Sequence, residues 1–330
     1  MVCAGDLAGQ GGRCGLWHDE RSMDTDMGPA LSGNPLRFAH LSDLHLPHEP
    51  RLRLREHFSK RQLSVWSWRR RRLLQIPAVF QALRDEMAAH RPDRIVVTGD
   101  ITNFSLPAEF DAAARWLETL PAPLSLVPGN HDQLVPVPQA AGWGKLARWS
   151  TGDEWPYVHR HGTVSFIGLK SALPTAPLLA SGRVGAAQCT RLASVLGRER
   201  AAGQLRILLL HHPPAEGVVN MRKALADRRE LRAVLREQGA ELVLHGHARN
   251  ARLDSLQGPV GPIPCLCVPS SSALPNPNDE AARWHLLELP ASGAGWARVL
   301  VRQWSMDGGV SGGGGFIDAA RYELKLPSVE

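Results

Sequence analysis

The sequence contains few cysteines and no long apolar run. Five cysteines in 330 residues are too few and too scattered for a secreted disulfide scaffold, and the CxxC spacing of a zinc knuckle is absent. No stretch approaches the roughly 18 consecutive apolar residues that would predict a membrane-spanning helix. We therefore expect reduced or buried thiols and a cytoplasmic location.

The chain also lacks a uniform charge of one sign. It has 38 Lys and Arg against 32 Asp and Glu, a net charge of +6. Residues 51–72 alone hold nine basic residues and one Glu, so their local charge of +8 exceeds that of the whole chain. Because the basic residues are concentrated in one segment, a uniformly basic surface that binds nucleic acid is not predicted, and nucleic acid is not expected as a partner.

Composition along the chain predicts one large domain with two tails. Residues 1–34 are Gly-rich and acidic and lack the pattern of a signal peptide, so we expect a flexible N-terminal tail. Residues 35–305 are expected to form the domain, with residues 51–72 as a basic insertion. A Gly-rich stretch after position 306 predicts a C-terminal tail over 306–330.

Short apolar strands alternate with helical patterns through the expected domain. Helices are predicted to begin at Pro77 and Pro107, and a basic helix is predicted over 221–238. This alternation is typical of an α/β or layered α+β fold. The apolar runs that we expect to be strands near the functional residues are 36–41, 94–98, 123–127, 206–210 and 241–244.

Each of these five strands ends in a cluster of Asp, Asn or His. One such cluster would fit a turn, but five can converge, because sites in α/β sheets form at the carboxyl ends of strands. Imidazole, carboxylate and carboxamide donors together suit Mn, Fe, Zn or Co rather than Ca. The clusters are Asp43 with His45; Asp100; Asn130, His131 and Asp132; His211 with His212; and His247.

The number of donors exceeds what one tetrahedral zinc ion requires, so two divalent metal ions are expected. Asp100, which follows Gly99 at a strand end, is the best candidate for a carboxylate that bridges them. Two cations about 4 Å apart would lower the pKa of a shared water and provide a bridging hydroxide for in-line attack on phosphorus.

The blocks SDLH, TGD, PGNHD, LLHHPP and LHGH resemble the signature of the calcineurin-like metallophosphoesterases, over about residues 36–290. The resemblance implies a four-layer αββα sandwich of two mixed β-sheets, with a dinuclear metal site at the strand ends. It assigns Asp43 and His45 to one metal, Asp100 to the bridge, and Asn130, His211 and His247 to the other metal. It further implies that His131 faces the substrate as a catalytic residue and that Asp132 orients it.

Two positions keep alternatives open. The family's last block is usually Gly-His-x-His, whereas this chain has Arg249 where the second His is expected. A guanidinium has no lone pair to offer a metal, so either Arg249 binds a substrate phosphate oxygen or one metal is weakly held. We favour substrate binding, because every other ligand position is filled. Of the adjacent histidines, His211 is the expected ligand and His212 a substrate-side neighbour, although the sequence barely separates them.

The resulting hypothesis is a metal-dependent hydrolase of phosphoric esters, most like the bacterial phosphodiesterase-type branch of the family. One alternative is a lipid-linked pyrophosphohydrolase of the UDP-diacylglucosamine type, active at a membrane surface. The Trp-containing basic segment 51–72 favours this alternative if it contacts anionic lipid at the inner face of the membrane, although it could equally be a lid or a solvated surface. A degenerate, non-catalytic binding protein is a further alternative, supported only by Arg249.

Overall fold

The computed structural model describes residues 35–327, apart from residues 152, 278, 291–294 and 309–313. The predicted N-terminal tail, residues 1–34, therefore lies outside the described residues. All the elements below belong to one unit of the chain.

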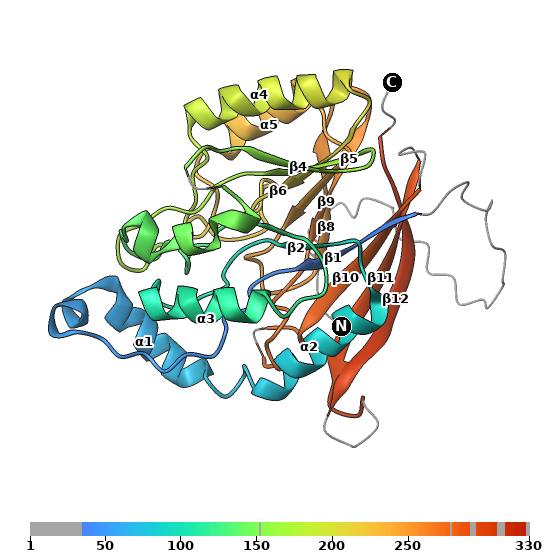
Figure 1. Ribbon diagram of the computed structural model, residues 1–330. Helices are drawn as coiled ribbons and strands as arrows, with labels where there is room; N and C mark the ends of the chain where they lie inside the picture. Colours follow the sequence, from blue (N-terminus) through green and yellow to red (C-terminus); the bar gives the residue numbers. More distant parts are fainter. Residues whose placement is uncertain (1–34, 152, 278, 291–294, 309–313, 328–330) are drawn as a thin grey trace, which may run out of the picture. The chain divides into compact units, whose positions relative to one another are not determined.

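Two six-stranded mixed sheets pack face to face with helices outside them, which confirms the predicted four-layer sandwich (Figure 1). The first sheet has the order β12-β11-β10-β1-β2-β3 and the second the order β4-β5-β6-β7-β9-β8. The strands of the first sheet are β1 (Leu36–Leu41), β2 (Arg94–Val97), β3 (Leu124–Leu126), β10 (Arg283–Leu289), β11 (Trp296–Ser305) and β12 (Gly315–Lys325). Those of the second are β4 (Tyr157–His161), β5 (Val164–Gly168), β6 (Leu205–Leu209), β7 (Leu242–His245), β8 (Arg252–Gln257) and β9 (Pro262–Cys267).

Each sheet has a parallel part, which lies at the centre of the second sheet and at the β3 end of the first. Strands β1, β2 and β3 run parallel in the first sheet, and β5, β6, β7 and β9 run parallel in the second. The flanking strands join them in antiparallel fashion. Parallel strands end at the same edge of a sheet, so this topology gathers the polar segments that follow β1, β2, β3, β6 and β7.

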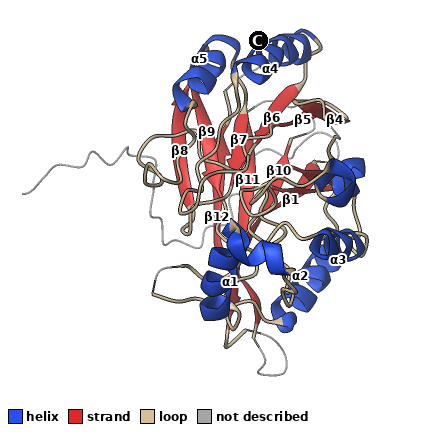
Figure 2. Ribbon diagram, turned by 90° about the vertical axis from the view of Figure 1, so that its left-hand side faces the viewer, coloured by secondary structure: helices blue, strands red, loops and turns tan. Residues whose placement is uncertain are grey.

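Helices cover the outer faces of the sandwich (Figure 2). Helices α2 (Pro77–His90) and α3 (Pro107–Leu117) lie beside the first sheet, and α4 (Ala186–Ala201) and α5 (Arg228–Gln238) beside the second. Both α2 and α3 begin with proline, which lacks the N–H group that would have no partner in a first turn. Short 3₁₀ helices occupy Leu54–Phe58, Gln139–Ala141 and Trp143–Trp149.

Aromatic packing joins the two sheets. Phe38 on β1 and Phe166 on β5 are both fully buried, and their rings meet edge to face with centroids 5.2 Å apart. Such contacts add to the hydrophobic free energy of burying both side chains. The core therefore fixes the two sheets against one another, which is necessary because both sheets contribute residues to the polar edge.

The basic segment 51–72 folds as the 3₁₀ helix followed by α1 (Lys60–Arg71). Val65 and Trp68 of α1 are buried against Phe104 and Leu106, in the loop after β2. The guanidinium of Arg61 donates to the carbonyl oxygens of Phe104, at 2.9 Å, and of Ser105, at 2.7 Å. The segment is thus anchored to the domain by one face of α1.

Two expectations about the later part of the chain are wrong. The predicted C-terminal tail over 306–330 contains β12, an eleven-residue strand that pairs with β11 along its whole length. The Gly-rich composition around it concealed the strand. The predicted helix over 221–238 begins only at Arg228, and residues 221–227 form turns and an isolated bridge to Gly182 instead.

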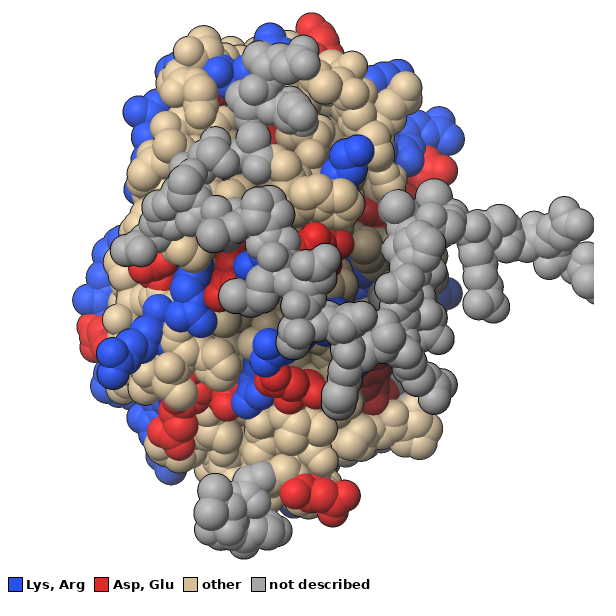
Figure 3. Space-filling model, turned by 90° about the vertical axis from the view of Figure 1, so that its right-hand side faces the viewer, with Lys and Arg blue, Asp and Glu red and all other residues tan. Residues whose placement is uncertain are grey.

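Basic and acidic side chains are interspersed on the side of the molecule where β11 and β12 lie (Figure 3). Arg302 on β11 pairs with Glu86 of α2, at 2.7 Å, and with Asp318 of β12. Arg298 pairs with Glu323 across the same two strands. Carboxylates on β12 and α2 therefore compensate Arg298 and Arg302 of β11.

Candidate metal centre

Five strand ends from both sheets meet at one site. The segments after β1, β2 and β3 come from the first sheet, and those after β6 and β7 come from the second. Two groups of possible ligands result, with the donor atoms of each group within 4.8 Å of one another. The groups are His45, Asp100 and His131, and Asp100, His211 and His247.

Asp100 belongs to both groups, as expected for a bridging carboxylate. Its Oδ2 atom lies 3.4 Å from Nε2 of His211 and 3.9 Å from Nε2 of His45. Its Oδ1 atom accepts a hydrogen bond from the backbone N–H of His131 at 2.7 Å. The side chain is almost fully buried, so its charge requires compensation from the groups around it.

Four imidazoles of the site share one arrangement. Each has one ring nitrogen within hydrogen-bond distance of a backbone carbonyl, which leaves the other nitrogen directed into the site. Ligating histidines in proteins are typically oriented in this way. The pairs are His45 Nδ1 with Thr102 (3.3 Å), His131 Nδ1 with Asn103 (2.8 Å), His211 Nδ1 with Thr98 (2.7 Å) and His247 Nε2 with Lys223 (3.1 Å).

The donor atoms near His211 fit a cation. Its Nε2 atom lies 3.1 Å from Oδ1 of Asn130 and 3.1 Å from Nδ1 of His247. When Nδ1 of His211 and Nε2 of His247 donate to backbone carbonyls, Nε2 of His211 and Nδ1 of His247 face each other, and both carry lone pairs. Lone pairs at this separation repel one another unless a proton or a metal ion lies between them. The residues therefore suit a metal such as Mn, Fe, Zn or Co.

The titration behaviour of the site also favours positive charge. Burial acts to lower the pKa of His211, but the carboxylates of Asp100 and Asp43 outweigh it and raise the pKa to about 9. Burial acts to raise the pKa of Asp100, but the charge of His211 outweighs it and holds the pKa well below its usual range. Burial raises the pKa of Asp43 to about 6. The same field that holds a proton on an imidazole would attract a metal cation.

The backbone at the site is strained in a consistent way. Left-handed φ angles are uncommon outside glycine and cluster at functional sites. Four expected ligands have them: Asp43 (48°), His45 (45°), Asp100 (52°) and His247 (67°). In addition, a Cβ atom on Gly129 would lie only 2.2 Å from Oδ1 of Asp100, so only glycine fits there. Local backbone geometry thus turns the ligand side chains towards one another.

Asp132 bonds mainly to the backbone of two loops, and its expected role in orienting His131 stays a prediction. Its carboxylate accepts hydrogen bonds from the backbone N–H groups of Ile101, Thr102 and Gly129, and from the hydroxyl of Thr102. The carbonyl of Asn103, rather than this carboxylate, lies 2.8 Å from Nδ1 of His131. Asp132 therefore joins the loops after β2 and β3.

The structure distinguishes the adjacent histidines. His211 points into the site, whereas Nδ1 of His212 lies 2.9 Å from the Ser171 hydroxyl and Nε2 lies 3.1 Å from the Ala180 carbonyl. His212 is fully buried and does not line the cavity at the site. Burial lowers its pKa to about 3, so it stays neutral. Its hydrogen bonds support the wall of the site, and its expected contact with substrate stays a prediction.

Arg249 does lie at the site. Its guanidinium pairs with Asp279 at 3.1 Å, is about half exposed, and lines the same cavity of about 120 Å³ as Asp43 and His45. Asp43 itself accepts hydrogen bonds through Oδ2 from the Ser42 hydroxyl, at 2.7 Å, and from the backbone N–H of His247, at 3.0 Å.

Several residues of the cavity wall escaped the sequence analysis. Lys223 falls within the helix predicted over 221–238, but the segment that carries it turns towards the site and supplies the carbonyl near His247. Leu74 and Gln75, which lie shortly after the basic segment, also line the cavity, whereas none of the described residues of 51–72 does. No motif marks these wall residues; they are Leu74, Gln75, Ala180, Lys223, Ala248, Ser270, Ala273 and Asp279.

Comparison with known proteins agrees with this geometry. Residues 36–248 match the family described as calcineurin-like phosphoesterase. The chain belongs to this family. It is therefore a metal-dependent phosphoric ester hydrolase, of a family that depends on two metal ions.

Relatives of similar length support the assignment. The chain is 28% identical to a probable cyclic nucleotide phosphodiesterase of Synechococcus, over 78% of this chain and 89% of the relative. It is 26% identical to a 3′,5′-cyclic-nucleotide phosphodiesterase of Nostoc, over 68% and 82%. Among solved structures, a dimetal phosphatase from Danio rerio aligns with a TM-score of 0.55 at 14% identity, over 89% of this chain and all of that one. This last likeness concerns the fold alone.

The adjacent histidines provide a direct test of the ligand assignment. We predict that His211→Ala lowers bound Mn²⁺ from about two ions per chain to about one, because it removes a donor that faces Asn130 and His247. His212→Ala should keep about two, because neither of its ring nitrogens faces the ligands. Metal content is measured by mass spectrometry on protein whose folding is verified by circular dichroism. Loss of metal in His212→Ala but not in His211→Ala would reverse the assignment.

Proposed function

We propose that this protein hydrolyses phosphodiesters with two divalent cations, which two groups of ligands that share Asp100 would hold. The observation that carries the proposal is the shared position of Asp100 between the two groups of possible ligands. The names of the Synechococcus and Nostoc relatives support a diester rather than a monoester substrate. Mixed nitrogen and oxygen donors support Mn, Fe, Zn or Co as the metals.

In this proposal Asp43, His45 and Asp100 would hold one metal ion. Asn130, His211 and His247 would hold the other, with Asp100 shared. When bound, such ions supply Lewis-acid stabilisation of phosphoryl oxygens and lower the pKa of water. The buried carboxylates and carbonyl-anchored imidazoles of this chain keep the donor atoms in place before substrate arrives.

His131 is the proposed catalytic acid. Its Nδ1 atom lies 2.8 Å from the Asn103 carbonyl, and its ring packs edge to face on His45 with centroids 4.8 Å apart. Nδ1 therefore serves as the fixed end of the ring, and Nε2 is the atom proposed to act on substrate. In the protonated ring, Nε2–H would stabilise charge on a phosphoryl oxygen or give its proton to the leaving oxygen.

Hydrolysis of two nitrophenyl esters tests the proposal. After reconstitution with Mn²⁺, the protein should release nitrophenol from bis(p-nitrophenyl) phosphate faster than from p-nitrophenyl phosphate, and a chelator should stop the reaction. Asp100→Asn should lower kcat by more than about 100-fold, because it removes the charge that both groups share. If neither ester is hydrolysed with any divalent metal and the purified protein contains none, the proposed function is wrong.

Arg249 is proposed to bind a phosphate oxygen of the substrate. It lies in the cavity, it is partly exposed, and its partner Asp279 also lines the cavity. A guanidinium held in this way can exchange part of its contact with a carboxylate for a phosphate oxygen.

We expect Arg249→Ala to raise KM for bis(p-nitrophenyl) phosphate about tenfold with unchanged metal content, because one charged hydrogen bond is lost. A matched control is Arg252→Ala, because Arg252 is a similarly exposed arginine paired with Asp254 and does not line the cavity. Arg249→His separates the alternatives, since it would improve metal binding if the arginine position were a missing ligand. Wild-type behaviour of both Arg249 variants would mean that the residue has neither role.

A second candidate function, hydrolysis of a lipid-linked pyrophosphate at a membrane surface, is favoured by one observation. The basic segment presents Phe58, 94% exposed, Leu54, 87% exposed, and Trp66, 55% exposed, next to several arginines. Apolar side chains among cations suit the interface of an anionic bilayer. Among the described residues, no helix is long and apolar enough to cross a membrane.

Vesicle flotation tests this contact. The wild-type protein should float with vesicles that contain phosphatidylglycerol and less with neutral phosphatidylcholine vesicles, because both insertion and charge contribute. Replacing Leu54, Phe58 and Trp66 together with serine should abolish flotation without loss of diesterase activity. Val260→Ser, at an exposed apolar residue far along the chain, is the control. Equal flotation of all variants, or none by the wild type, would contradict membrane contact.

A further inference from the structure

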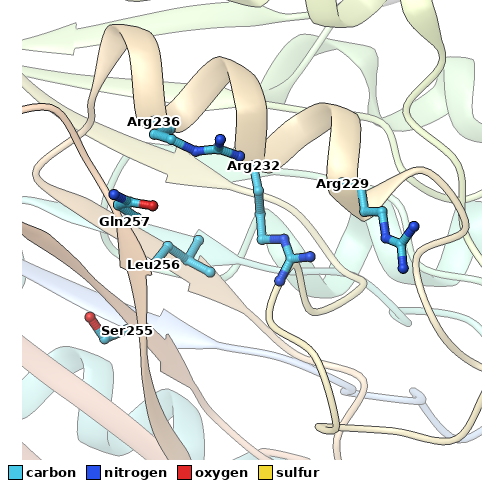
Figure 4. A pocket seen from close by; sticks show the side chains of 6 residues that line it. All are labelled: Arg229, Arg232, Arg236, Ser255, Leu256 and Gln257. Atoms are coloured by element: carbon cyan, nitrogen blue, oxygen red, sulfur yellow. The ribbon is translucent and has the colours of Figure 1, made fainter.

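A groove between α5 and β8 lies apart from the metal centre. It forms a cavity of about 430 Å³ and shares no lining residue with the cavity at the ligand cluster. Three arginines of one helix and three consecutive residues of one strand line it (Figure 4). They are Arg229, Arg232 and Arg236 from α5, and Ser255, Leu256 and Gln257 from β8.

The arginines form one stripe of α5, because their spacing of three and four residues places them on the same side of the helix. Arg232 pairs with Glu216. For Arg229 and Arg236, the described part of the chain provides no ion pair, and both are exposed. Three arginines therefore face this groove, with Glu216 the carboxylate that interacts with Arg232 and Arg229.

The strand side of the groove is an open sheet edge. β8 is the last strand of its sheet and pairs only with β9. The N–H of Val268 donates to His245 at 3.2 Å, so the even-numbered residues of β9 direct their backbone groups towards β7. The odd-numbered residues face β8 and pair with Arg252, Asp254 and Leu256.

The backbone groups of every second residue of β8 therefore point away from the sheet. The backbone N–H and C=O groups of Leu253, Ser255 and Gln257 point away from β9, and the described residues give them no hydrogen-bond partner. Ser255 and Gln257 are exposed. An edge of this kind offers alternating donors and acceptors to another extended chain.

We propose that this groove binds an extended acidic peptide segment of a partner protein, added as a further strand along β8. The backbone of the peptide would pair with Ser255 and Gln257, and its carboxylates would bind Arg229 and Arg236. The open edge favours a peptide over a free phosphate or a nucleic-acid backbone, because phosphate oxygens can only accept and would leave the strand carbonyls unpaired. The arginines select acidic side chains by charge.

Fluorescence anisotropy with the full chain tests the proposal. The probe is a labelled peptide of about eight residues in which Glu alternates with Thr. The peptide should bind the wild type. Its affinity should fall about tenfold in the double variant that combines Arg229→Ala and Arg236→Ala, because two charged contacts are lost. Arg222→Ala removes an exposed arginine outside the groove and should leave binding unchanged.

Two further measurements separate backbone pairing from charge attraction. Ser255→Pro removes an N–H that points outwards, so it should lower the affinity for the peptide. The hydrogen bonds between β8 and β9 and the diesterase activity should persist. The same peptide with alternate backbone nitrogens methylated should also fail to bind, and this test needs no protein variant. Binding of the methylated peptide, or tighter binding of pyrophosphate or a single-stranded oligonucleotide, would overturn the proposal. So would the absence of binding by the unmodified peptide.

Discussion

The ionised carboxylate of Asp100, nearly inaccessible to water, is the constraint on which the rest of the centre depends. A buried charge is costly unless it is paired, and burial acts to raise its pKa. Here the charge of His211 outweighs burial, and the N–H of His131 holds one oxygen at 2.7 Å. The geometry of both sheets follows from this requirement. A donor from β6 and a donor from the β3 loop can reach the same carboxylate only if the sheets are packed face to face.

Backbone strain is the second part of the same arrangement. Left-handed conformations at Asp43, His45, Asp100 and His247 cost about 1 kcal/mol or more each, and they persist only where surrounding packing enforces them. The Phe38–Phe166 contact and the parallel strands behind the ligands provide that packing. Packing in the core therefore maintains the left-handed backbone conformations at the expected ligands, which the loops alone would not adopt.

The sequence predicts the parts of the site that follow a strand directly. The positions of Asp100 and His211 can be predicted because each residue follows a buried strand, whose end places it at the edge of the sheet. The hydrogen-bond partners of Asp132 and His212 cannot be predicted in this way, because they are distant in the sequence. Asp132 bonds to Thr102, and His212 lies near the carbonyl of Ala180. In the fold, β12 was missed since its pairing with β11 overrides a Gly-rich composition, and Lys223 was misplaced since uniform basic residues conceal the start of a helix.

The distribution of charge distinguishes three regions of the molecule that the net charge of +6 cannot. At the metal centre, positive charge comes from imidazoles and would come from bound cations, and the buried carboxylates of Asp43 and Asp100 offset part of it. On the basic segment, arginines surround exposed apolar side chains such as Phe58, a combination that water solvates poorly and a bilayer interface accommodates. Beside β8, Arg229 and Arg236 accompany open backbone groups instead, and no bilayer can satisfy those groups. The two basic surfaces therefore call for different partners, because the groups that surround the arginines differ.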